Sequence, residues 1–489
     1  MIRSVRRLAD RLADRLPAAA IVTDAAAIAP WLTDWRGRFH GRADLLLAPA
    51  GVAEVQAIVA TAREEGVPLV PQGGNSSMVG GATPPADGAA AILSLRRLNR
   101  VRAIDAAAGL AVAEAGVILS DLHDAAIAAG VRFPLSLGAK GSATVGGLVS
   151  TNAGGTQVLR FGTMRGLVAG VEAVLPDGSL YDGLAALKKD NRGYDLTQLL
   201  IGAEGTIGVV TAATLRLVPA VASRTVAWVG LASPEAAMTL LHRFRRVTAA
   251  LESFELLPDD SLAAVLAHLP QARAPLEADH PWHVLLEVTA DDPADDTAAV
   301  TGDAPAALVE RLLGAALDEG LIADAVIAAS EAQADAFWRI RESISDAERA
   351  LGPAAQHDIS VPVAAMPRFM LDAAAACEAR FPGTQASGFG HLGDGNVHFH
   401  VRAAPGSDPE RWYAQDAPVV SRFVHDLVIA AGGSISAEHG IGQMKLDELE
   451  RLSSPARMAA LRAIKAAFDP ANLMNPGKLV TLAPGGRTA

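Results

Sequence analysis

Cysteine is almost absent from this chain of 489 residues, which contains only Cys377. A single thiol cannot form an internal disulfide, ligate an iron–sulfur cluster or build a cysteine-rich zinc site. Cys377 lies in the Ala-rich stretch LDAAAACEAR, which predicts a helix with the thiol as a small buried side chain. The sequence therefore excludes a fold held together by disulfide bonds.

Positive charge is also scarce. The chain has 42 Lys and Arg against 54 Asp and Glu, a formal net charge of −12, and no basic run. Such a surface repels phosphate backbones and anionic lipids. We therefore expect no nucleic-acid partner.

No segment combines the length and apolar character of a bilayer span. The longest charge-free stretch near the middle, 141–159, contains Ser, Thr, Asn, Gln and five glycines. The Arg-rich N-terminus, 1–17, has interleaved aspartates and no apolar segment after it, which favours a surface helix over a targeting peptide. We expect no transmembrane segment and a cytoplasmic location, with peripheral association with a membrane left open.

Apolar residues make up 50% of the chain, enough to fill more than one core. At about 150 residues per domain, the length predicts about three units or two large ones. In the first 220 residues, strand and helix signals alternate. We expect a helix over 52–65, a helix ending at Gly130 with Ser120 as N-cap, and a hairpin at Asp177–Gly178. Further strands are predicted at 68–71, 91–95, 101–105, 110–116 and 206–219.

A second pattern begins near Ser223, where strands at 225–233, 282–290 and 324–330 alternate with helices. The last of these helices is predicted to run without a break through FWRIRESISDAERA, 337–350. This order predicts an α+β layer, a sheet with helices on one face. The final stretch, about 430–489, combines short helices with Gly-rich segments.

Three Gly-rich loops lie in the first half, at 71–81, 138–155 and 202–208. Glycines let backbone N–H groups approach a ligand, and successive N–H groups bind anions such as a pyrophosphate. The letters Gly388-Phe389-Gly390-His391-Leu392-Gly393 match G-x-G-x-x-G, but an alternating strand pattern follows instead of a helix. We therefore reject a Rossmann site there.

Three of the twelve histidines, His391, His398 and His400, fall within ten residues. If GDGN, 393–396, is a four-residue hairpin loop, His391 lies directly opposite His398, and His400 shares the face of His398. Opposite Cβ atoms are about 4.5–5.5 Å apart, close enough for two imidazoles to bind one metal ion. The spacing predicts a metal site.

A carboxylate should complete this site, and Ala437-Glu438-His439-Gly440 offers one. Adjacent side chains on an extended chain point to opposite faces. Glu438 and His439 could therefore reach the same site only through a bend, which Gly440 and Gly442 favour. A His/His/Glu site leaves coordination positions open, as a catalytic metal requires; Zn²⁺ is favoured and Mn²⁺ also fits.

The chain resembles a known family in motifs that run in order over about residues 30–480. PQGGNSSMVGG, GSATVGGLVSTNAGG and IGAEGTIGVVT resemble the FAD-binding domain of the vanillyl-alcohol oxidase type. WRIRES, HDISVP, GHLGDGNVH, AEHGIG and FDPANLMNPGKL resemble its D-2-hydroxyacid dehydrogenase branch, which includes D-2-hydroxyglutarate and D-lactate dehydrogenases.

The resemblance implies an α+β fold: a two-subdomain FAD-binding domain at 1–220, a substrate domain with an antiparallel sheet at 221–430, and a segment at 431–489 that returns to the flavin. The 71–81 loop lacks the His or Cys that links flavin covalently in some relatives, so FAD should be non-covalent. The expected FAD-binding residues are Pro71, Gln72, Gly73, Gly74, Asn75, Ser76, Ser77, Val79, Gly80, Leu135, Gly138, Ser142, Thr144, Gly146, Gly147, Thr151, Asn152, Glu204, Gly208, Val209 and Asn475.

For the chemistry, the resemblance implies His391, His398 and Glu438 as metal ligands and His439 as catalytic base. A chelated D-2-hydroxy acid would lose its hydroxyl proton to His439 and a hydride from C2 to flavin N5. The expected substrate-binding residues are Arg341, Ser345, Gln356, Asn396 and His400. Arg341 and Ser345 would share one face of a single helix.

Two positions depart from the pattern of the relatives, which commonly carry Lys where this chain has Gln356 and often Asn where it has His400. Gln removes a fixed positive charge from a carboxylate site, and a nearby metal opposes protonation of His400. The resemblance favours D-2-hydroxyglutarate as substrate, with D-lactate or D-malate close behind. The missing charge predicts weaker dependence on a second carboxylate than a strict hydroxyglutarate enzyme shows, with D-lactate or longer apolar D-hydroxy acids tolerated.

Three alternatives stay open: a glycolate-oxidase-type subunit of an electron-transfer complex, a non-catalytic flavin- or metal-binding scaffold, and a reductase of peptidoglycan precursors. A reductase of peptidoglycan precursors lacks such a histidine cluster, which counts against this third alternative. Electrons should leave through a separate acceptor, electron-transfer flavoprotein or a quinone. A homodimer is compatible with the sequence.

Overall fold

The computed structural model describes residues 2–291 and 305–482 and divides into two compact units. The first unit comprises Met1–Gly154, Thr163–Pro219 and Glu438–Ala489, and the second comprises Gly155–Gly162 and Ala220–Ala437. Segments from both ends of the sequence thus share one unit, while 155–162 belong to the other. The α+β class predicted from the sequence is confirmed.

The first unit is built on short strands. They are β1 (Ile21–Val22), β2 (Leu46–Leu47), β3 (Leu69–Gln72), β4 (Ala91–Ser94), β5 (Val101–Asp105), β6 (Leu110–Glu114), β7 (Val131–Arg132), β8 (Val168–Val174), β9 (Leu180–Gly183), β10 (Val209–Arg216) and β11 (Val218–Pro219). One sheet has the order β1-β2-β4-β3, in which β2 and β3 run parallel to β4. A second, antiparallel sheet has the order β5-β6-β10-β8-β9, and β7 pairs with β11.

The helices of the first unit include the one predicted over 52–65. They are α1 (Arg3–Leu12), α2 (Ala25–Ile28), α3 (Val52–Glu65), α4 (Leu119–Ala128), α5 (Val145–Thr151), α7 (Met164–Leu167), α8 (Leu196–Leu200), α17 (Leu446–Leu452) and α18 (Pro455–Phe468). The N-cap of α4 is Ile118, so the expectation of Ser120 was wrong by two residues. The predicted hairpin at Asp177–Gly178 is confirmed by the pairing of β8 with β9.

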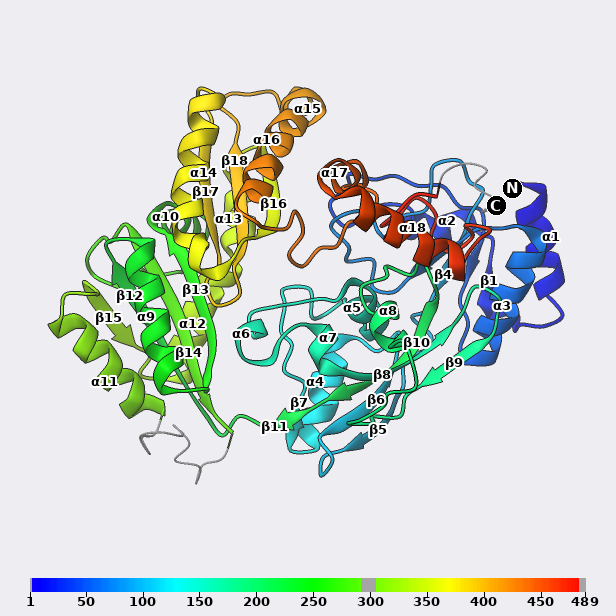
Figure 1. Ribbon diagram of the computed structural model, residues 1–489, viewed down its shortest axis with the longest axis horizontal. Coiled ribbons are helices and arrows are strands. Elements are labelled where there is room, and N and C mark those ends of the chain that lie inside the picture. Colours follow the sequence, from blue (N-terminus) through cyan, green and yellow to red (C-terminus); the bar gives the residue numbers. More distant parts are fainter. Residues whose placement is uncertain (1, 292–304, 483–489) are drawn as a thin grey trace. The chain divides into compact units, whose positions relative to one another are not determined.

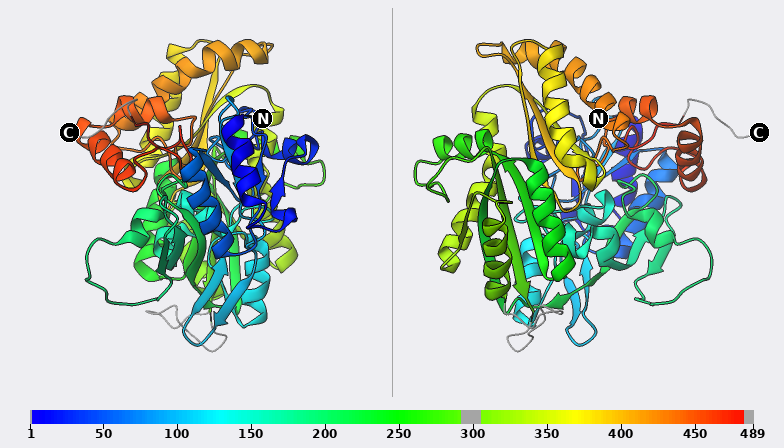
Figure 2. Two further views of the ribbon diagram at one scale, coloured as in Figure 1. Left: turned by 90° about the vertical axis from the view of Figure 1, so that its right-hand side faces the viewer. Right: turned by 60° about the vertical axis from the view of Figure 1, so that its left-hand side comes forward.

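Helix α1 packs beside α3 through an apolar face, and both views in Figure 2 are consistent with this pairing. Val5, Leu8 and Leu12 follow helical spacing and are fully buried. Burying one Leu or Val side chain contributes about 1.5–3 kcal/mol. Arg7 and Arg11 add ion pairs to Glu65, but solvent screens these, so the apolar face holds α1 in place.

The motif FDPANLMNPGKL is locked around a buried lysine. The Lys465 ammonium donates to the carboxylate of Asp469 and to the backbone carbonyls of Thr206 and Met474. Burial lowers the pKa of Lys465, although Asp469 opposes this shift. Asp469 also accepts from the N–H groups of Leu473 and Met474. This network fixes the backbone of Leu473 and Met474, which leads directly to Asn475.

The second unit is organised by one antiparallel sheet (Figure 1). Its order is β15-β12-β14-β13-β17-β18-β16. The bounds are β12 (Ser223–Leu231), β13 (Leu251–Pro258), β14 (Trp282–Ala290), β15 (Asp324–Ile327), β16 (Ala354–Ser360), β17 (Gln385–His391) and β18 (Asn396–Arg402). The predicted helix between 290 and 324 is described from Pro305 onward, and the rest of that stretch lies outside the described residues.

Helices cover both faces of this sheet, so the expectation of helices on one face was wrong. The helices of the second unit are α6 (Val158–Phe161), α9 (Pro234–Val247), α10 (Asp259–His268), α11 (Pro305–Asp318), α12 (Glu331–Glu342), α13 (Ile344–Ala350), α14 (Met366–Arg380), α15 (Pro409–Arg411) and α16 (Ala417–Ala430). One core joins α9, α11, α14 and α16 to alternate strand residues such as Val229 and Phe399. A second core joins α10, α12 and α13 to Trp228 and Phe389.

The burial pattern of the strands explains why helices cover both faces of the sheet. Seven consecutive residues of β12, from Thr225 to Leu231, are buried, because both faces of the strand are covered.

The predicted continuous helix through 337–350 is interrupted: α12 ends at Glu342 and α13 starts at Ile344. Within residues 2–291 and 305–482, no helix is both long and apolar enough to cross a bilayer.

The burial of Cys377 in α14 gives a direct test of this packing. Its side chain is fully buried, and desolvation raises the pKa of the thiol to about 12. The thiolate is the reactive form, so native protein should show no reaction with a chromogenic disulfide reagent at pH 8, and one thiol after denaturation. Rapid labelling of the native protein would contradict this packing.

Candidate functional site

Two of the predicted Gly-rich loops lie against each other in the first unit. A Cβ on Gly74 would be 1.9 Å from the backbone oxygen of Ser142, and one on Gly73 would be 2.2 Å from the Thr144 hydroxyl oxygen. Real contacts at these distances do not occur, so position 74 requires glycine, and a side chain at position 73 would force the Thr144 hydroxyl to move. In the structure, glycine is favoured here because the two loops contact each other. The sequence had suggested a different reason, the close approach of a pyrophosphate.

The third loop and the C-terminal motif meet the first loop. The Asn475 side-chain amide donates to the backbone carbonyls of Gly81 and Glu204, at 2.9 and 2.7 Å. A Cβ on Gly205 would be 3.1 Å from the ring of Pro71. The structure therefore brings together the three loops and Asn475, which the sequence singled out separately.

Several side chains around these loops have buried polar atoms that lack a protein partner. Among the described residues, Thr144 Oγ1, Gln72 Oε1 and Asn475 Oδ1 are buried without a hydrogen bond. Buried polar groups are normally satisfied, so such atoms indicate a missing polar ligand. All three belong to the predicted FAD-binding set, and this fits a polar ligand at the loops.

Glu204 has a different environment from the one expected of an FAD-binding side chain. Its carboxylate accepts the backbone N–H groups of Ile441 and Gly442 at 2.7 and 2.8 Å. Burial raises the pKa of Glu204, although these donors and the nearby Lys445 and Lys478 oppose the shift. Glu204 thus anchors the loop that follows the AEHG motif. Its assignment as an FAD-binding residue stays a prediction.

The predicted bend after Glu438 and His439 is present. Gly440 and Gly442 both lie in the left-handed region, with φ of +80° and +53°. A Cβ on Gly440 would be 2.7 Å from Glu204 Oε1, and one on Gly442 would be 2.3 Å from the Val79 backbone oxygen. Glycine is therefore required at both positions by conformation and by space.

The histidine hairpin forms with a different register from the predicted one. Its loop is 392–395 rather than 393–396, so His391 lies opposite Asn396 and His398 lies opposite Phe389. The expected direct pairing of His391 with His398 was wrong. Both side chains nevertheless occupy one face, diagonal to each other, with ring centroids 5.6 Å apart. The hairpin also confirms that 388–393 are not a Rossmann motif.

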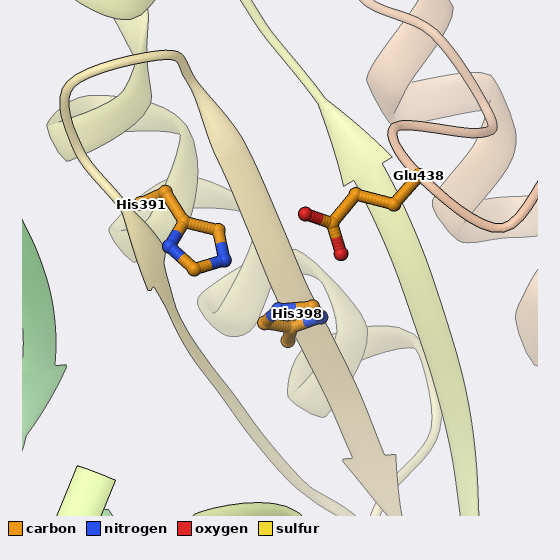
Figure 3. A group of neighbouring side chains, drawn as sticks. All are labelled: His391, His398 and Glu438. Atoms are coloured by element: carbon orange, nitrogen blue, oxygen red, sulfur yellow. The ribbon is translucent and has the colours of Figure 1, made fainter. Parts of the chain in front are cut away.

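The two histidines and one carboxylate form a potential ligand set. His391, His398 and Glu438 each offer one ligand atom, and these atoms lie within 4.8 Å of one another. The second unit ends at Ala437, so Glu438 is joined to it by a peptide bond. Figure 3 shows the Glu438 carboxylate directed toward the two rings. Two imidazoles and a carboxylate suit a divalent metal such as Zn²⁺ or Mn²⁺.

Asp358 was not among the residues chosen from the sequence. It lies opposite His398 on β16, and with Glu438 and His439 it forms a second group whose ligand atoms are within 4.8 Å of one another. The side-chain amide of Asn396 donates to Asp358 Oδ1 at 3.0 Å, so Asn396 holds this carboxylate. The Oδ1 atom of Asn396 is buried and has no hydrogen-bond partner among the described residues.

Arg341 is buried, and it does not share a helix face with Ser345. The break at Ser343 separates them, and Ser345 is exposed whereas Arg341 is 7% exposed. The predicted shared face was therefore wrong. The guanidinium of Arg341 lies over the ring of Phe389 at 5.1 Å, and its Nε donates to Glu255 Oε2 at 2.7 Å.

Glu255 is the second residue that sequence reasoning missed. It is fully buried on β13, and its Oε1 atom is 2.7 Å from His391 Nδ1. Burial alone would raise the pKa of Glu255, but His391 and Arg341 lower it to about 2. A charged residue inside the apolar strand LESFELLP was the available signal, since such a residue is buried only with partners.

Gln356 and His400 form a pair across β16 and β18. Nδ1 of His400 is 3.6 Å from Glu348 Oε2, which also accepts from Arg402 at 2.7 Å. Burial opposes ionisation of Glu348, but His400 and Arg402 lower its pKa overall. The two positions expected to depart from the relatives' pattern thus lie opposite each other, and His400 lies beside a buried carboxylate.

The contact between the two loops makes Gly74 the sharpest test of the FAD-binding region. Gly74→Val should greatly reduce the flavin content of purified protein, because its side chain must displace the Ser142 backbone. Gly141→Ala is the matched control, since no atom lies within 4 Å of its added Cβ. Flavin absorbance per chain measures both, and normal content in Gly74→Val would contradict the loop contact.

Known proteins match the chain over nearly its whole length. The family of FAD linked oxidases, C-terminal domain, matches residues 221–479, and the FAD binding domain family matches residues 43–183. The D-2-hydroxyglutarate dehydrogenase of Xanthomonas citri pv. viticola is 36% identical, covering 96% of each chain. The mitochondrial D-2-hydroxyglutarate dehydrogenase of Arabidopsis thaliana is 35% identical, covering 94% of this chain and 79% of the relative.

Solved structures share the fold. That of p-cresol methylhydroxylase superposes with a TM-score of 0.75 at 14% identity, covering 98% of this chain and 97% of the other. The chain therefore belongs to the FAD-linked oxidases of the vanillyl-alcohol oxidase fold, in the D-2-hydroxyacid dehydrogenase branch, and is an FAD-dependent oxidoreductase.

Proposed function

We propose that this enzyme oxidises D-2-hydroxy acids to 2-oxo acids, with D-2-hydroxyglutarate as the favoured substrate and 2-oxoglutarate as its product. The observation that carries the proposal is the convergence of His391, His398 and Glu438 ligand atoms within 4.8 Å. The names of the relatives at 35–36% identity support the choice of substrate.

Two groups would complete the site. FAD, held without a covalent bond by the three loops, accepts a hydride from the substrate when bound. A divalent metal held by His391, His398 and Glu438, with Zn²⁺ favoured over Mn²⁺, would lower the pKa of the substrate hydroxyl.

The remaining steps belong to side chains of the chain itself. His439 follows Glu438 directly in the chain. We assign His439 as the base whose imidazole receives the proton of the substrate hydroxyl. Arg341 binds the substrate carboxylate, because a guanidinium fixed in plane matches two carboxylate oxygens. Asp358, grouped with Glu438 and His439, is placed to orient or stabilise the protonated imidazole.

The reaction balances without oxygen. The C2–H and O–H bonds of the substrate break and its C–O bond becomes C=O. The proton goes to His439, and the hydride, which carries both electrons, would go to bound FAD. A separate acceptor must then reoxidise the enzyme. We propose electron-transfer flavoprotein or a quinone, and a second polypeptide of a glycolate-oxidase-type complex is the alternative.

The proposal predicts a separation between ligand and base variants. His391→Ala and His398→Ala should each lose metal and D-2-hydroxyglutarate turnover while keeping FAD, because the FAD-binding residues lie in other motifs. His439→Ala should keep the metal but slow turnover by about 10²–10⁴-fold, as for loss of a general base. Elemental analysis and dye-linked assays measure both properties.

Two outcomes would count against this division. Metal loss in His439→Ala as severe as in His398→Ala would make His439 a ligand. Full turnover in His391→Ala would remove the metal from the reaction. Oxidation of L-2-hydroxyglutarate at the rate of the D enantiomer would contradict the proposed substrate class.

Gln356 provides a test of substrate choice. A strand residue directly opposite His400 can reach the same ligand, and Lys there would add a charge-assisted hydrogen bond to a second carboxylate. Gln356→Lys should raise the ratio of kcat/KM for D-2-hydroxyglutarate to that for D-lactate about 10-fold, for about 1.5 kcal/mol. Gln356→Met, of similar length without charge, is the control and should not raise it. An unchanged ratio in Gln356→Lys would place specificity elsewhere.

A further inference from the structure

We infer that Glu255 is a positioning residue, which fixes a metal ligand and the substrate-binding arginine relative to each other. The inference rests on the proposed function, because it takes His391 as a ligand of the metal and Arg341 as the anchor of the substrate carboxylate. It adds a residue that contacts neither metal nor substrate and acts through both partners.

One carboxylate makes both contacts. Oε1 of Glu255 lies 2.7 Å from Nδ1 of His391, and Oε2 lies 2.7 Å from Nε of Arg341. Glu255 is 0% exposed, so neither contact is weakened by water. The sheet register sets the first contact, because Glu255 on β13 lies directly opposite His391 on β17.

The contact with His391 determines which ring nitrogen is available. An ionised carboxylate can only accept, so Nδ1 must carry the proton and donate it. The lone pair is then on Nε2, the nitrogen left to bind a metal. Figure 3 shows the ring with one nitrogen turned toward the side of His398 and Glu438. A carboxylate behind a ligand histidine fixes its tautomer and raises its basicity.

The contact with Arg341 holds the guanidinium while leaving donors unused. Glu255 accepts from Nε, and the plane of the group is set further by the Phe389 ring at 5.1 Å. The Nη2 atom of Arg341 also lies 2.7 Å from Glu255 Oε2, so this oxygen contacts two nitrogens of the guanidinium. A guanidinium has five N–H donors, so those not directed at Glu255 can bind an acceptor such as the carboxylate of a hydroxy acid.

A purely structural ion pair would look similar, and the same strand offers a comparison. Glu252 is also buried on β13, at 1% exposed, and accepts from Gln157, Arg160 and Thr289. It therefore has an arginine partner but contacts neither His391 nor Arg341 in any of these bonds. Glu252→Gln controls for the loss of a buried carboxylate charge as such.

The experiment measures Zn²⁺ affinity of the full chain by competition with a chromogenic chelator, together with the thermal unfolding midpoint of the metal-free protein. In Glu255→Gln the amide can accept only through one atom, so it cannot hold both partners as before. We expect affinity for Zn²⁺ to fall about 10–100-fold and the KM for D-2-hydroxyglutarate to rise. Glu252→Gln should retain the wild-type affinity within about twofold, whatever its effect on the unfolding midpoint.

Each outcome is decisive. Wild-type affinity in Glu255→Gln, or equal weakening in Glu252→Gln, overturns the positioning role while leaving the proposed function intact. Failure of wild-type protein to bind either Zn²⁺ or Mn²⁺ stoichiometrically overturns the metal-dependent function and this inference with it. If Glu255→Gln does not fold, Glu255→Asp is measured by the same criteria, since it keeps the charge but withdraws the carboxylate by one methylene group.

Discussion

A carboxylate can be buried in a protein only where donors surround it, and this requirement shapes each part of the candidate site. Glu204 is satisfied by two backbone N–H groups of the loop after His439. Glu255 is satisfied by His391 and Arg341, and Glu348 by Arg402 with His400 beside it. Each pairing fixes a side chain or loop that the proposed chemistry uses, so the same contacts stabilise the fold and position the reacting groups.

Local patterns predicted much of the fold and the composition of the site. The helix over Val52–Glu65 follows from apolar spacing and the left-handed Gly66 that ends it. The histidine hairpin was found with the wrong register, yet the prediction that both rings share a face survives. Moving a four-residue loop by one residue changes each pairing by two positions, and side chains alternate with period two.

Other features depend on contacts between distant segments. Nothing local marks Ser343 as a helix break, which separates buried Arg341 from exposed Ser345. The partners of Glu255 lie 86 and 136 residues away along the chain. Glycine at position 74 was expected for the sake of a ligand, but the Ser142 backbone already demands it. Sequence reasoning identified the residue types, and the sheet register decided which of them meet.

The central claim is that a metal-dependent site in this flavoprotein oxidises D-2-hydroxy acids. Anaerobic rapid mixing tests it most directly, because the loss of oxidised-flavin absorbance reports hydride transfer without any external acceptor. Metal-loaded protein should be bleached by D-2-hydroxyglutarate, whereas the L enantiomer, or protein stripped by a chelator but still holding FAD, should leave the flavin oxidised. Equally fast bleaching of metal-free protein, or equal bleaching by both enantiomers, would contradict the account.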